Sequence, residues 1–286
     1  MKPSVYHGDC LRLLREMPAG SVDLIATDPP FNTGRVWEHK AGKFKDIFAS
    51  RSAFTEYMRE RVVEMKRVLS PTGSLYLHCD PKTSHYLKVM LDSVFGEECF
   101  RAEIIWRMGH VSGFKTAKKG WIRNHDVILH YSVDPAQFTF NKPYKPKTPE
   151  YILGFDKVDE EGRRYRRISH GGGNRRLYLD DAKGIPIDDV WNASSADILP
   201  SLMIVMTSEL RGYPTQKPIA LYERIIAASS NPGDLVLDPF CGSGTTLVAA
   251  HKLRRRAIGF DAGEEAVALA RARVDEIAAQ GLLDIA

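Results

Sequence analysis

Residues 234–246 read DLVLDPFCGSGTT and join an apolar strand pattern to a turn that contains two glycines. Residues 235–237 are apolar throughout, which is typical of a strand covered on both faces. Gly242 and Gly244 carry no side chain, so a ligand can approach the backbone of the turn closely. A helical pattern follows at once, and the free amides at the start of a helix point toward such a ligand. The stretch therefore predicts a strand–turn–helix unit with a ligand site at the end of the strand.

An acidic residue ends the next strand pattern, RAIGFD, and stands 23 residues after Asp238. This residue, Asp261, is well placed to bind the two hydroxyls of a ribose. Two better-known nucleotide-binding motifs do not match this sequence. A phosphate-binding loop needs a lysine after its last glycine, whereas Gly244 is followed by two threonines, and a dinucleotide fingerprint needs a small residue where the chain has Leu247. The pattern favours a ligand that contains a ribose but needs no pyrophosphate cradle.

Strand and helix patterns alternate on both sides of this unit. Such alternation predicts an α/β fold with a doubly wound, mostly parallel Rossmann-like sheet. Ser52 is the expected N-cap of the long helix in the first half, and Gly96 is the expected end of the next helix. The expected strands are 4–9, 22–27, 74–80, 101–108, 126–133, 234–238 and 256–261, and the expected helices are 10–17, 52–69, 84–96, 215–230, 247–253 and 264–280.

The composition is that of an ordinary globular protein. The chain has 286 residues, of which 43% are hydrophobic and 27% are charged, so it is long enough for one large domain with an insertion. It shows no secretory start and no apolar run near the roughly 20 residues that span a bilayer. We therefore expect a protein of the cytoplasm that has no membrane partner.

Four cysteines stand singly in the sequence, and no C-x-x-C pair occurs. Neither a metal site nor a disulfide framework is expected from this spacing. Cys241 lies inside the glycine turn, but no histidine is near it in the sequence to activate it as a nucleophile. We therefore do not assign Cys241 a catalytic role.

The alternation stops between about residues 110 and 212, where Gly, Lys, Arg and aromatic residues dominate. Residues 142–176 carry ten Lys and Arg against five Asp and Glu, and residues 101–123 carry six against one. A concentrated basic surface favours a polyanionic partner, although charge alone fits a solvated loop face equally well. Interleaved tyrosines and phenylalanines argue against a fully disordered segment.

A second motif ends the strand pattern VDLIATDPPFN at residues 22–32. Ligands of doubly wound sheets lie beyond the carboxyl ends of the strands, and Asp28 is at such an end. Pro29 and Pro30 hold the chain extended and leave the backbone carbonyls around them free as acceptors. A carboxylate and a carbonyl together suit an amino group with two hydrogens, and Phe31 offers a ring for stacking a planar heterocycle. A plain proline turn beside a solvated acid is the alternative.

These motifs together resemble those of a known enzyme family. Residues 28–31 (DPPF) are similar to the D-P-P-Y/F motif of amino-group DNA methyltransferases, and residues 238–246 (DPFCGSGTT) are similar to their S-adenosylmethionine motif. The catalytic motif precedes a basic insertion and the cofactor motif comes last, which is similar to the permuted β-class. HGDC at residues 7–10 and YPTQKP at residues 213–218 also match the family.

The resemblance implies a site-specific enzyme that methylates the N6 amino group of adenine in double-stranded DNA. It makes Asp28 and the carbonyl of Pro29 the acceptors for that amino group, with Pro30 beside them and Phe31 stacked on a base flipped out of the duplex. Transfer is direct, without a covalent bond between enzyme and base. In this family an Asp at the first motif position goes mostly with adenine, and the N4 amino group of cytosine is the alternative.

The resemblance also assigns the cofactor residues. Asp261 would bind the ribose of S-adenosylmethionine, Asp9 would lie beside the adenine, and Lys217 would meet the methionine carboxylate. Asp80 ends another strand on the same rim, where a pocket role and a structural role are equally expected. The cofactor motif contributes Asp238, Phe240, Gly242, Gly244 and Thr245.

The resemblance also implies a division of the chain into three parts. Residues 1–110 form the catalytic half of the methyltransferase domain, residues 111–212 form the target recognition region with the end of the sheet at its start, and residues 213–286 form the cofactor-binding half.

Relatives are often dimers, which makes a homodimer a candidate assembly and a cognate restriction endonuclease a candidate partner. An inactive DNA-binding subunit and an RNA methyltransferase are weaker alternatives. The arginines expected at DNA are Arg163, Arg164, Arg166, Arg167, Arg175 and Arg176.

Overall fold

The computed structural model describes residues 2–39, 42–107, 116–117, 119–170, 173–191 and 205–283. The chain divides into two compact units. The larger unit comprises Met1–Asn141 and Asp189–Ala286, and the smaller unit comprises Lys142–Asp188. In the described part of the chain, no helix is long and apolar enough to cross a membrane.

A mixed sheet of eight strands runs through the described residues of the larger unit. Every neighbouring pair is parallel except the two pairs that involve the seventh strand of the chain, which lies antiparallel to both neighbours. The predicted doubly wound, mostly parallel sheet is therefore confirmed. Its order is β1 (Ser4–His7), β13 (Arg256–Asp261), β12 (Leu235–Asp238), β2 (Val22–Thr27), β5 (Leu69–Cys79), β7 (His125–Ser132), β6 (Phe100–Arg107) and β11 (Val190–Trp191).

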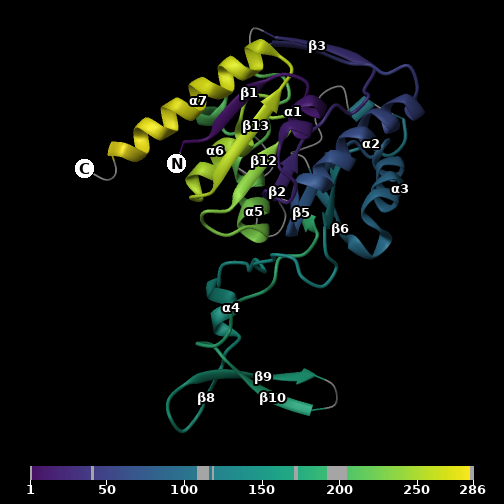
Figure 1. Cartoon of the computed structure of the whole chain (residues 1–286). Coiled ribbons are helices and arrows are strands. Elements are labelled where there is room, and N and C mark those ends of the chain that lie inside the picture. Colours follow the sequence, from purple (N-terminus) through teal and green to yellow (C-terminus); the bar gives the residue numbers. More distant parts are fainter. Residues whose placement is uncertain are drawn as a thin grey trace. The chain divides into compact units, whose positions relative to one another are not determined.

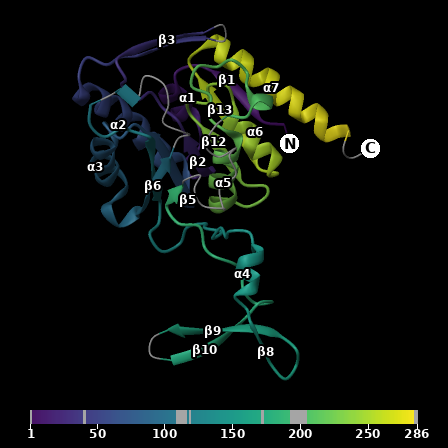
Figure 2. The ribbon, with the colours of Figure 1, turned by 180° about the vertical axis from the view of Figure 1, so that it is seen from behind.

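Helices cover this sheet in two groups (Figures 1 and 2). One group is α1 (Cys10–Glu16), α2 (Arg51–Val68) and α3 (Ser84–Phe95), and the other is α5 (Ile219–Ser229), α6 (Thr245–Lys252) and α7 (Glu264–Leu283). Alternation along β5 separates the two faces. Leu75 and Leu77 join the core cluster that contains Phe54 of α2, whereas the Tyr76 hydroxyl lies 2.7 Å from the hydroxyl of Ser229 on α5.

The N-terminal cap of α2 is Ser50, so the prediction of Ser52 is wrong by two residues. The Ser50 side chain accepts a hydrogen bond from the amide of Ala53 at 3.0 Å, and its backbone is extended with φ −155°. A serine hydroxyl can bond an amide three residues ahead from either position, but only Ser50 precedes the first helical residue. Gly96 ends α3 as predicted, with φ +96°.

A short hairpin follows the DPPF motif where the sequence predicted no element. Strands β3 (Arg35–His39) and β4 (Gly42–Asp46) pair antiparallel, and Asp46 at the end of β4 is buried. Its carboxylate accepts hydrogen bonds from the amides of Asn32 and Thr33 and from the Thr33 hydroxyl. These bonds attach the hairpin to the residues that follow the DPPF motif.

The smaller unit contains α4 (Pro149–Leu153) and a three-stranded antiparallel sheet of β8 (Lys157–Val158), β9 (Arg164–His170) and β10 (Gly173–Tyr178). Phe155 and Tyr165 are its buried aromatic residues. The helix α4 has five residues. The larger unit also contains two short 3₁₀ turns, η1 (Glu97–Cys99) and η4 (Thr207–Glu209).

Candidate active site

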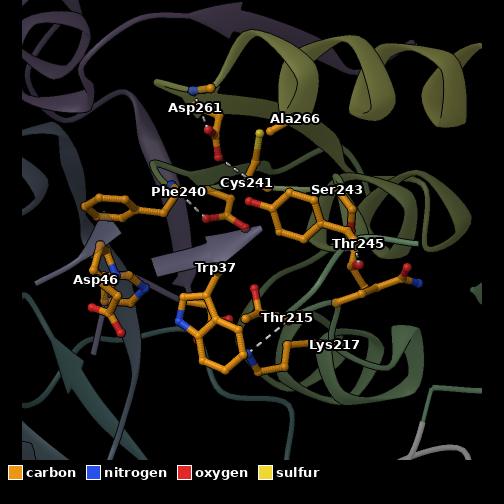
Figure 3. Close-up of a pocket in the computed structure, with 18 of the residues that line it drawn as sticks. Trp37, Asp46, Thr215, Lys217, Phe240, Cys241, Ser243, Thr245, Asp261 and Ala266 are labelled. Carbon is orange, nitrogen blue, oxygen red and sulfur yellow. Dashed lines mark hydrogen bonds and ion pairs between the residues drawn. The ribbon is translucent and has the colours of Figure 1, made fainter. Parts of the chain in front are cut away.

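A cavity of about 350 Å³ lies where β2, β12 and β13 end. These three strands are neighbours and parallel, so their carboxyl ends meet at one edge of the sheet. The volume is within the range of about 300–1,000 Å³ that is typical of small-molecule sites. The DPPF motif and the glycine turn, which are about 200 residues apart in the sequence, line this one cavity. Figure 3 shows Cys241 and Ser243 of the turn among the lining residues.

The glycine turn takes a conformation that a side chain would oppose. Gly242 and Gly244 have φ +49° and +76°, in the left-handed region that favours glycine. A Cβ atom on Gly242 would lie 3.1 Å from a ring carbon of Tyr213. The Gly242 amide donates to Asp261 Oδ2 at 2.9 Å, and the Gly263 amide donates to Asp261 Oδ1 at 2.8 Å. Asp261 thus anchors the turn to β13.

Asp238 is buried, with 2% of its surface exposed, although it lines the cavity. Its carboxylate accepts hydrogen bonds from the hydroxyls of Thr27 and Thr246 at 2.7 and 2.6 Å and from the Phe240 amide at 3.1 Å. These contacts join the end of β2 to the start of α6. Burial raises the pKa of Asp238 to about 6, since the hydrogen bonds offset only part of the lost hydration.

This raised pKa predicts a stability difference between the wild type and Asp238→Asn. Between pH 4 and 6 the folded wild type binds a proton at Asp238 that the unfolded chain lacks, so its stability falls as the pH rises. The change from the ordinary value of 3.8 to about 6 corresponds to about 3 kcal/mol. Urea denaturation at pH 4 and pH 7 should show the asparagine variant gaining about that amount relative to the wild type. A difference that stays constant with pH would contradict the assignment.

Asp28 lies directly after β2 and is largely buried, with 16% of its side chain exposed. The Lys217 ammonium forms an ion pair with its Oδ2 atom, and Nδ1 of His78 lies 2.8 Å from its Oδ1 atom. Burial would raise the pKa of Asp28, but the Lys217 ammonium and the His78 imidazole lower it to about 2. Asp28 is therefore a carboxylate at every pH at which an enzyme assay is practical.

Phe31 packs edge-on against this cluster. Its ring centroid is 5.0 Å from that of His78, with an angle of 82° between the planes, and Lys217 Nζ is 5.5 Å from the same ring. Pro29 and Pro30 line the cavity beside it. The prolines, the ring and the carboxylate of the DPPF motif thus share one wall.

The structure gathers most of the predicted site residues but not all of them. Lys217, Asp238, Phe240, Gly242, Thr245 and Asp261 line the cavity together with the DPPF motif. Gly244 is not a lining residue and is instead the N-cap of α6. Asp9 caps α1 through the Leu11 amide and forms an ion pair with Arg61 at 2.7 Å, also outside the lining. Asp80 forms an ion pair with Arg123.

Several lining residues have no counterpart in the sequence prediction. Trp37 of β3 and Asp46 of β4 reach the cavity through the unpredicted hairpin (Figure 3). Tyr213 lies in the predicted YPTQKP motif, but its contact with the turn depends on the fold. Arg273 of α7 lies outside the lining, and it donates to the Ser243 carbonyl at 2.7 Å and so stabilises the turn.

The six predicted DNA-binding arginines all lie in the smaller unit, and four of them have internal partners. Arg163 pairs with Asp180 and Asp181, and Arg164 donates to the carbonyls of Ile152 and Phe155. Arg166 lies over the rings of Tyr151 and Phe155, and Arg176 lies over that of Tyr165. Within the described residues, Arg167 and Arg175 are exposed and make no side-chain hydrogen bond, ion pair or ring contact.

Comparison with known proteins identifies the family. The model of the N6/N4 methyltransferases, described as DNA methylase, matches residues 22–272. The chain belongs to this family. It is 30% identical over 305 residues to the Type II methyltransferase M.EcaI of Enterobacter cloacae, covering 90% of this chain and 66% of the relative. It is 31% identical over 280 residues to the DNA adenine methyltransferase YhdJ of Escherichia coli K12, covering 95% of this chain and 82% of the relative.

The fold has solved counterparts. The complex of M1.HpyAVI with SAM matches with a TM-score of 0.59 and 20% identity, covering 95% of this chain and 98% of that one. The predicted Rossmann-like fold and the predicted amino-group DNA methyltransferase family are confirmed. The assignment to the permuted β-class and the roles of individual site residues stay predictions.

Proposed function

We propose that this protein transfers a methyl group from S-adenosylmethionine to the N6 amino group of adenine in double-stranded DNA. One observation carries the proposal: an ionised carboxylate at Asp28 and the anchored glycine turn line the same cavity. The first supplies an acceptor for an amino group, and the second supplies a close approach for a cofactor. The proposed acceptor for the amino group and the proposed cofactor site therefore share one cavity.

The cavity residues fit the cofactor. A Cβ atom on Gly242 would crowd the ring of Tyr213, 3.1 Å away, and the Asp261 carboxylate is at the end of the strand next to the turn. Asp261 would bind the ribose hydroxyls, and Ser243 and Thr245 would line the amino-acid portion. Phe240 adds an apolar ring to the wall. When bound, S-adenosylmethionine supplies a methyl group that is already activated on a sulfonium.

The chain itself then has to orient an amino nitrogen and stabilise the charge that grows on it. Asp28 is placed to accept a hydrogen bond from the amino group, which favours a localised lone pair on the nitrogen. Its negative charge also stabilises the positive charge of the transition state. Because Lys217 pairs with Oδ2 of Asp28, the target amino group must share or displace that contact when it binds.

Direct transfer is favoured over a covalent enzyme–base bond. The only cysteine that lines the cavity, among the described residues, is Cys241, and it is buried. Burial and the neighbouring Asp238 and Asp261 raise the pKa of this thiol well above its ordinary value. A thiol that stays protonated is a poor nucleophile.

The smaller unit supplies the surface proposed to bind DNA. Arg167 of β9 stands opposite Arg176 of β10 across the antiparallel pair. Like charges in that arrangement repel each other, and a phosphate between them would relieve the repulsion. Arg167 and Arg175 are the two predicted arginines without an internal partner in the described structure. Because Arg175 is adjacent to Arg176, it lies on the face opposite to Arg167, and each is a candidate for a separate phosphate contact.

Removing these two charges should weaken DNA binding in a salt-dependent manner. For the variant Arg167→Ala/Arg175→Ala, the plot of log K against log salt concentration should be shallower by about 1.8, because each phosphate contact contributes about 0.9. Fluorescence anisotropy with a labelled duplex over a salt series measures this slope. The double variant Arg12→Ala/Arg15→Ala on α1 removes the same charge and should leave the slope unchanged. Equal slopes for all three proteins would refute the assignment.

Labelled methyl transfer tests the whole proposal. The protein is incubated with genomic DNA and S-adenosylmethionine that carries a labelled methyl group, and the nucleosides are then separated. The expected product is N6-methyladenine, in agreement with the aspartate at position 28. N4-methylcytosine would keep the mechanism and replace the base. Label in structured RNA but not in DNA would replace the substrate.

The remaining partners follow from the same proposal. A Type II relative such as M.EcaI suggests a cognate restriction endonuclease, and a homodimer is the proposed assembly. A DNA substrate agrees with the predicted location in the cytoplasm. Sedimentation analysis of the purified protein at micromolar concentration tests the dimer, which would be refuted by the mass of a single chain.

A further inference from the structure

We infer that His78 is a positioning residue for Asp28, held as an imidazolium between the carboxylates of Asp28 and Asp126. In this arrangement it fixes the Asp28 carboxylate so that one oxygen faces the cavity. The inference rests on the proposed function, because it assigns Asp28 the role of acceptor for the target amino group.

The geometry places His78 between two acids from different parts of the fold. Its side chain, on β5, is 4% exposed. Nδ1 lies 2.8 Å from Asp28 Oδ1, at the end of β2, and Nε2 lies 3.3 Å from Asp126 Oδ2, on β7. The ring N–H directions are not aligned with these oxygens, so the contacts are short-range ion pairs rather than ideal hydrogen bonds.

Neutral imidazole does not suit this position. It carries one N–H group, whereas the nitrogen on the other side of the ring presents a lone pair. With carboxylate oxygens 2.8 and 3.3 Å from the two nitrogens, one carboxylate would then lie close to a nitrogen without a hydrogen in a buried site. An imidazolium has an N–H group at both nitrogens and attracts both carboxylates.

The surrounding charges are balanced only if His78 is a cation. Lys217 pairs with Asp28, and Arg123 pairs with both Asp126 and Asp80. The six groups alternate in sign across the end of the sheet, in the order Lys217, Asp28, His78, Asp126, Arg123 and Asp80. With a neutral His78 the row carries one uncompensated negative charge, which is costly in a buried site.

The other groups around the ring do not alter this conclusion. The rings of Phe31 and Trp106 meet it edge-on, with centroids 5.0 and 5.4 Å away. From α5, Tyr222 lies nearby, and burial raises the pKa of its phenol well above the ordinary value, so it is neutral. Burial lowers the pKa of His78, and so does the Lys217 ammonium. The carboxylates of Asp28 and Asp126 outweigh both and raise the pKa above its ordinary value.

A fixed Asp28 has a direct consequence for the proposed reaction. The contact with His78 occupies Oδ1, so Oδ2 is the oxygen that remains for Lys217 or for an amino group. Without the imidazolium the carboxylate could rotate, and misplacement of a reacting group by about 1 Å can cost about 100-fold in rate. Since an imidazolium has no free lone pair, His78 itself takes no proton in the reaction.

The charge state of His78 can be measured without any assay of activity. The ¹⁵N chemical shifts of the histidine side chains are recorded between pH 5 and 9 in the protein without cofactor, and the His78 signals are assigned with a His78→Gln variant. We expect both His78 nitrogens to be protonated at pH 7.5 in the wild type. In Asp126→Asn the proton should leave at a lower pH. A neutral His78 ring at pH 7 in the wild type would overturn the inference.

Kinetics then test the positioning role. His78→Gln and Asp126→Asn should lower kcat by about 10- to 100-fold, while the Kd of S-adenosylmethionine from calorimetry stays within about threefold. His130→Gln is the matched control, since His130 is a buried histidine of the same sheet that stacks on Tyr76, 4.0 Å away, and is not in contact with Asp28. Its kcat should stay near that of the wild type.

The outcomes separate the inference from the proposed function. If the wild type transfers methyl groups and both site variants keep its kcat, the positioning role is overturned although the function stands. If the wild type transfers no methyl group to nucleic acid, the proposed function fails, while the nitrogen shifts still decide whether His78 is an imidazolium.

Discussion

Replacement of Asp28 by asparagine is expected to lower kcat for methyl transfer by about 100- to 1,000-fold, the usual effect of removing one group that stabilises transition-state charge. The variant keeps the size of the side chain and loses its charge. The pKa of Asp28 is about 2, so the wild-type residue is ionised throughout the assay range and its charge acts on every turnover. Cofactor affinity should change little, because the glycine turn and Asp261 are untouched.

Labelled methyl transfer at saturating DNA and cofactor gives kcat, and calorimetry gives the Kd of S-adenosylmethionine. Asp275→Asn is a suitable control, since Asp275 is exposed on α7 and pairs with Lys2 at 2.5 Å. Loss of an exposed pair costs about 0–1 kcal/mol of stability and should leave kcat unchanged. An Asp28→Asn enzyme with more than a tenth of the wild-type kcat would contradict the proposed role of this carboxylate.

The sequence was sufficient to predict the edge of the sheet where the site lies, because the relevant signals are local. Gly242 is required by a turn with positive φ, and Asp28, Asp238 and Asp261 each follow an apolar strand pattern. Parallel strands with helices between them place their carboxyl ends at one edge, so three separate motifs could be assigned to one site without knowledge of the contacts.

The side-chain partners could not be predicted in the same way. His78 and Asp126 belong to strands that are almost 50 residues apart, and only the antiparallel pairing of β5 with β7 brings them together. Lys217 was assigned to the cofactor carboxylate from the family pattern, whereas its ammonium lies on Asp28 in this structure. Such contacts depend on strand order and side-chain rotamers, which leave no periodic signal in a single sequence.

The hairpin of β3 and β4 escaped prediction for a different reason. Its residues include several charges and few β-branched side chains, so the strand propensity is weak. The pairing is supported instead by Asp46, whose carboxylate binds the amides of Asn32 and Thr33. Trp37, which the hairpin carries to the cavity, was therefore missing from the predicted site.

Replacement of Asp261 by asparagine is expected to weaken cofactor binding and to leave kcat nearly unchanged, which is the reverse of the effect expected for Asp28→Asn. Asp261 already accepts the amides of Gly242 and Gly263, and the proposed ribose hydroxyls would bind the same carboxylate. A hydrogen bond to a charged group contributes about 1.5–3 kcal/mol, so loss of one such bond should raise the Kd of S-adenosylmethionine by about 10- to 150-fold. At saturating cofactor, kcat should fall less than threefold, because the amino-group acceptor is intact.

Calorimetry without DNA measures this Kd directly. Asp234→Asn is the matched control, because Asp234 accepts one backbone amide, from Asn231 at 2.7 Å, at the opposite end of β12. Burial raises the pKa of Asp261, so wild-type affinity should also fall as the pH is lowered toward that raised value, and the asparagine variant should lose this dependence. A Kd for Asp261→Asn within threefold of the wild type would mean that the ribose is held elsewhere, and would leave Asp261 with the role of anchoring the turn.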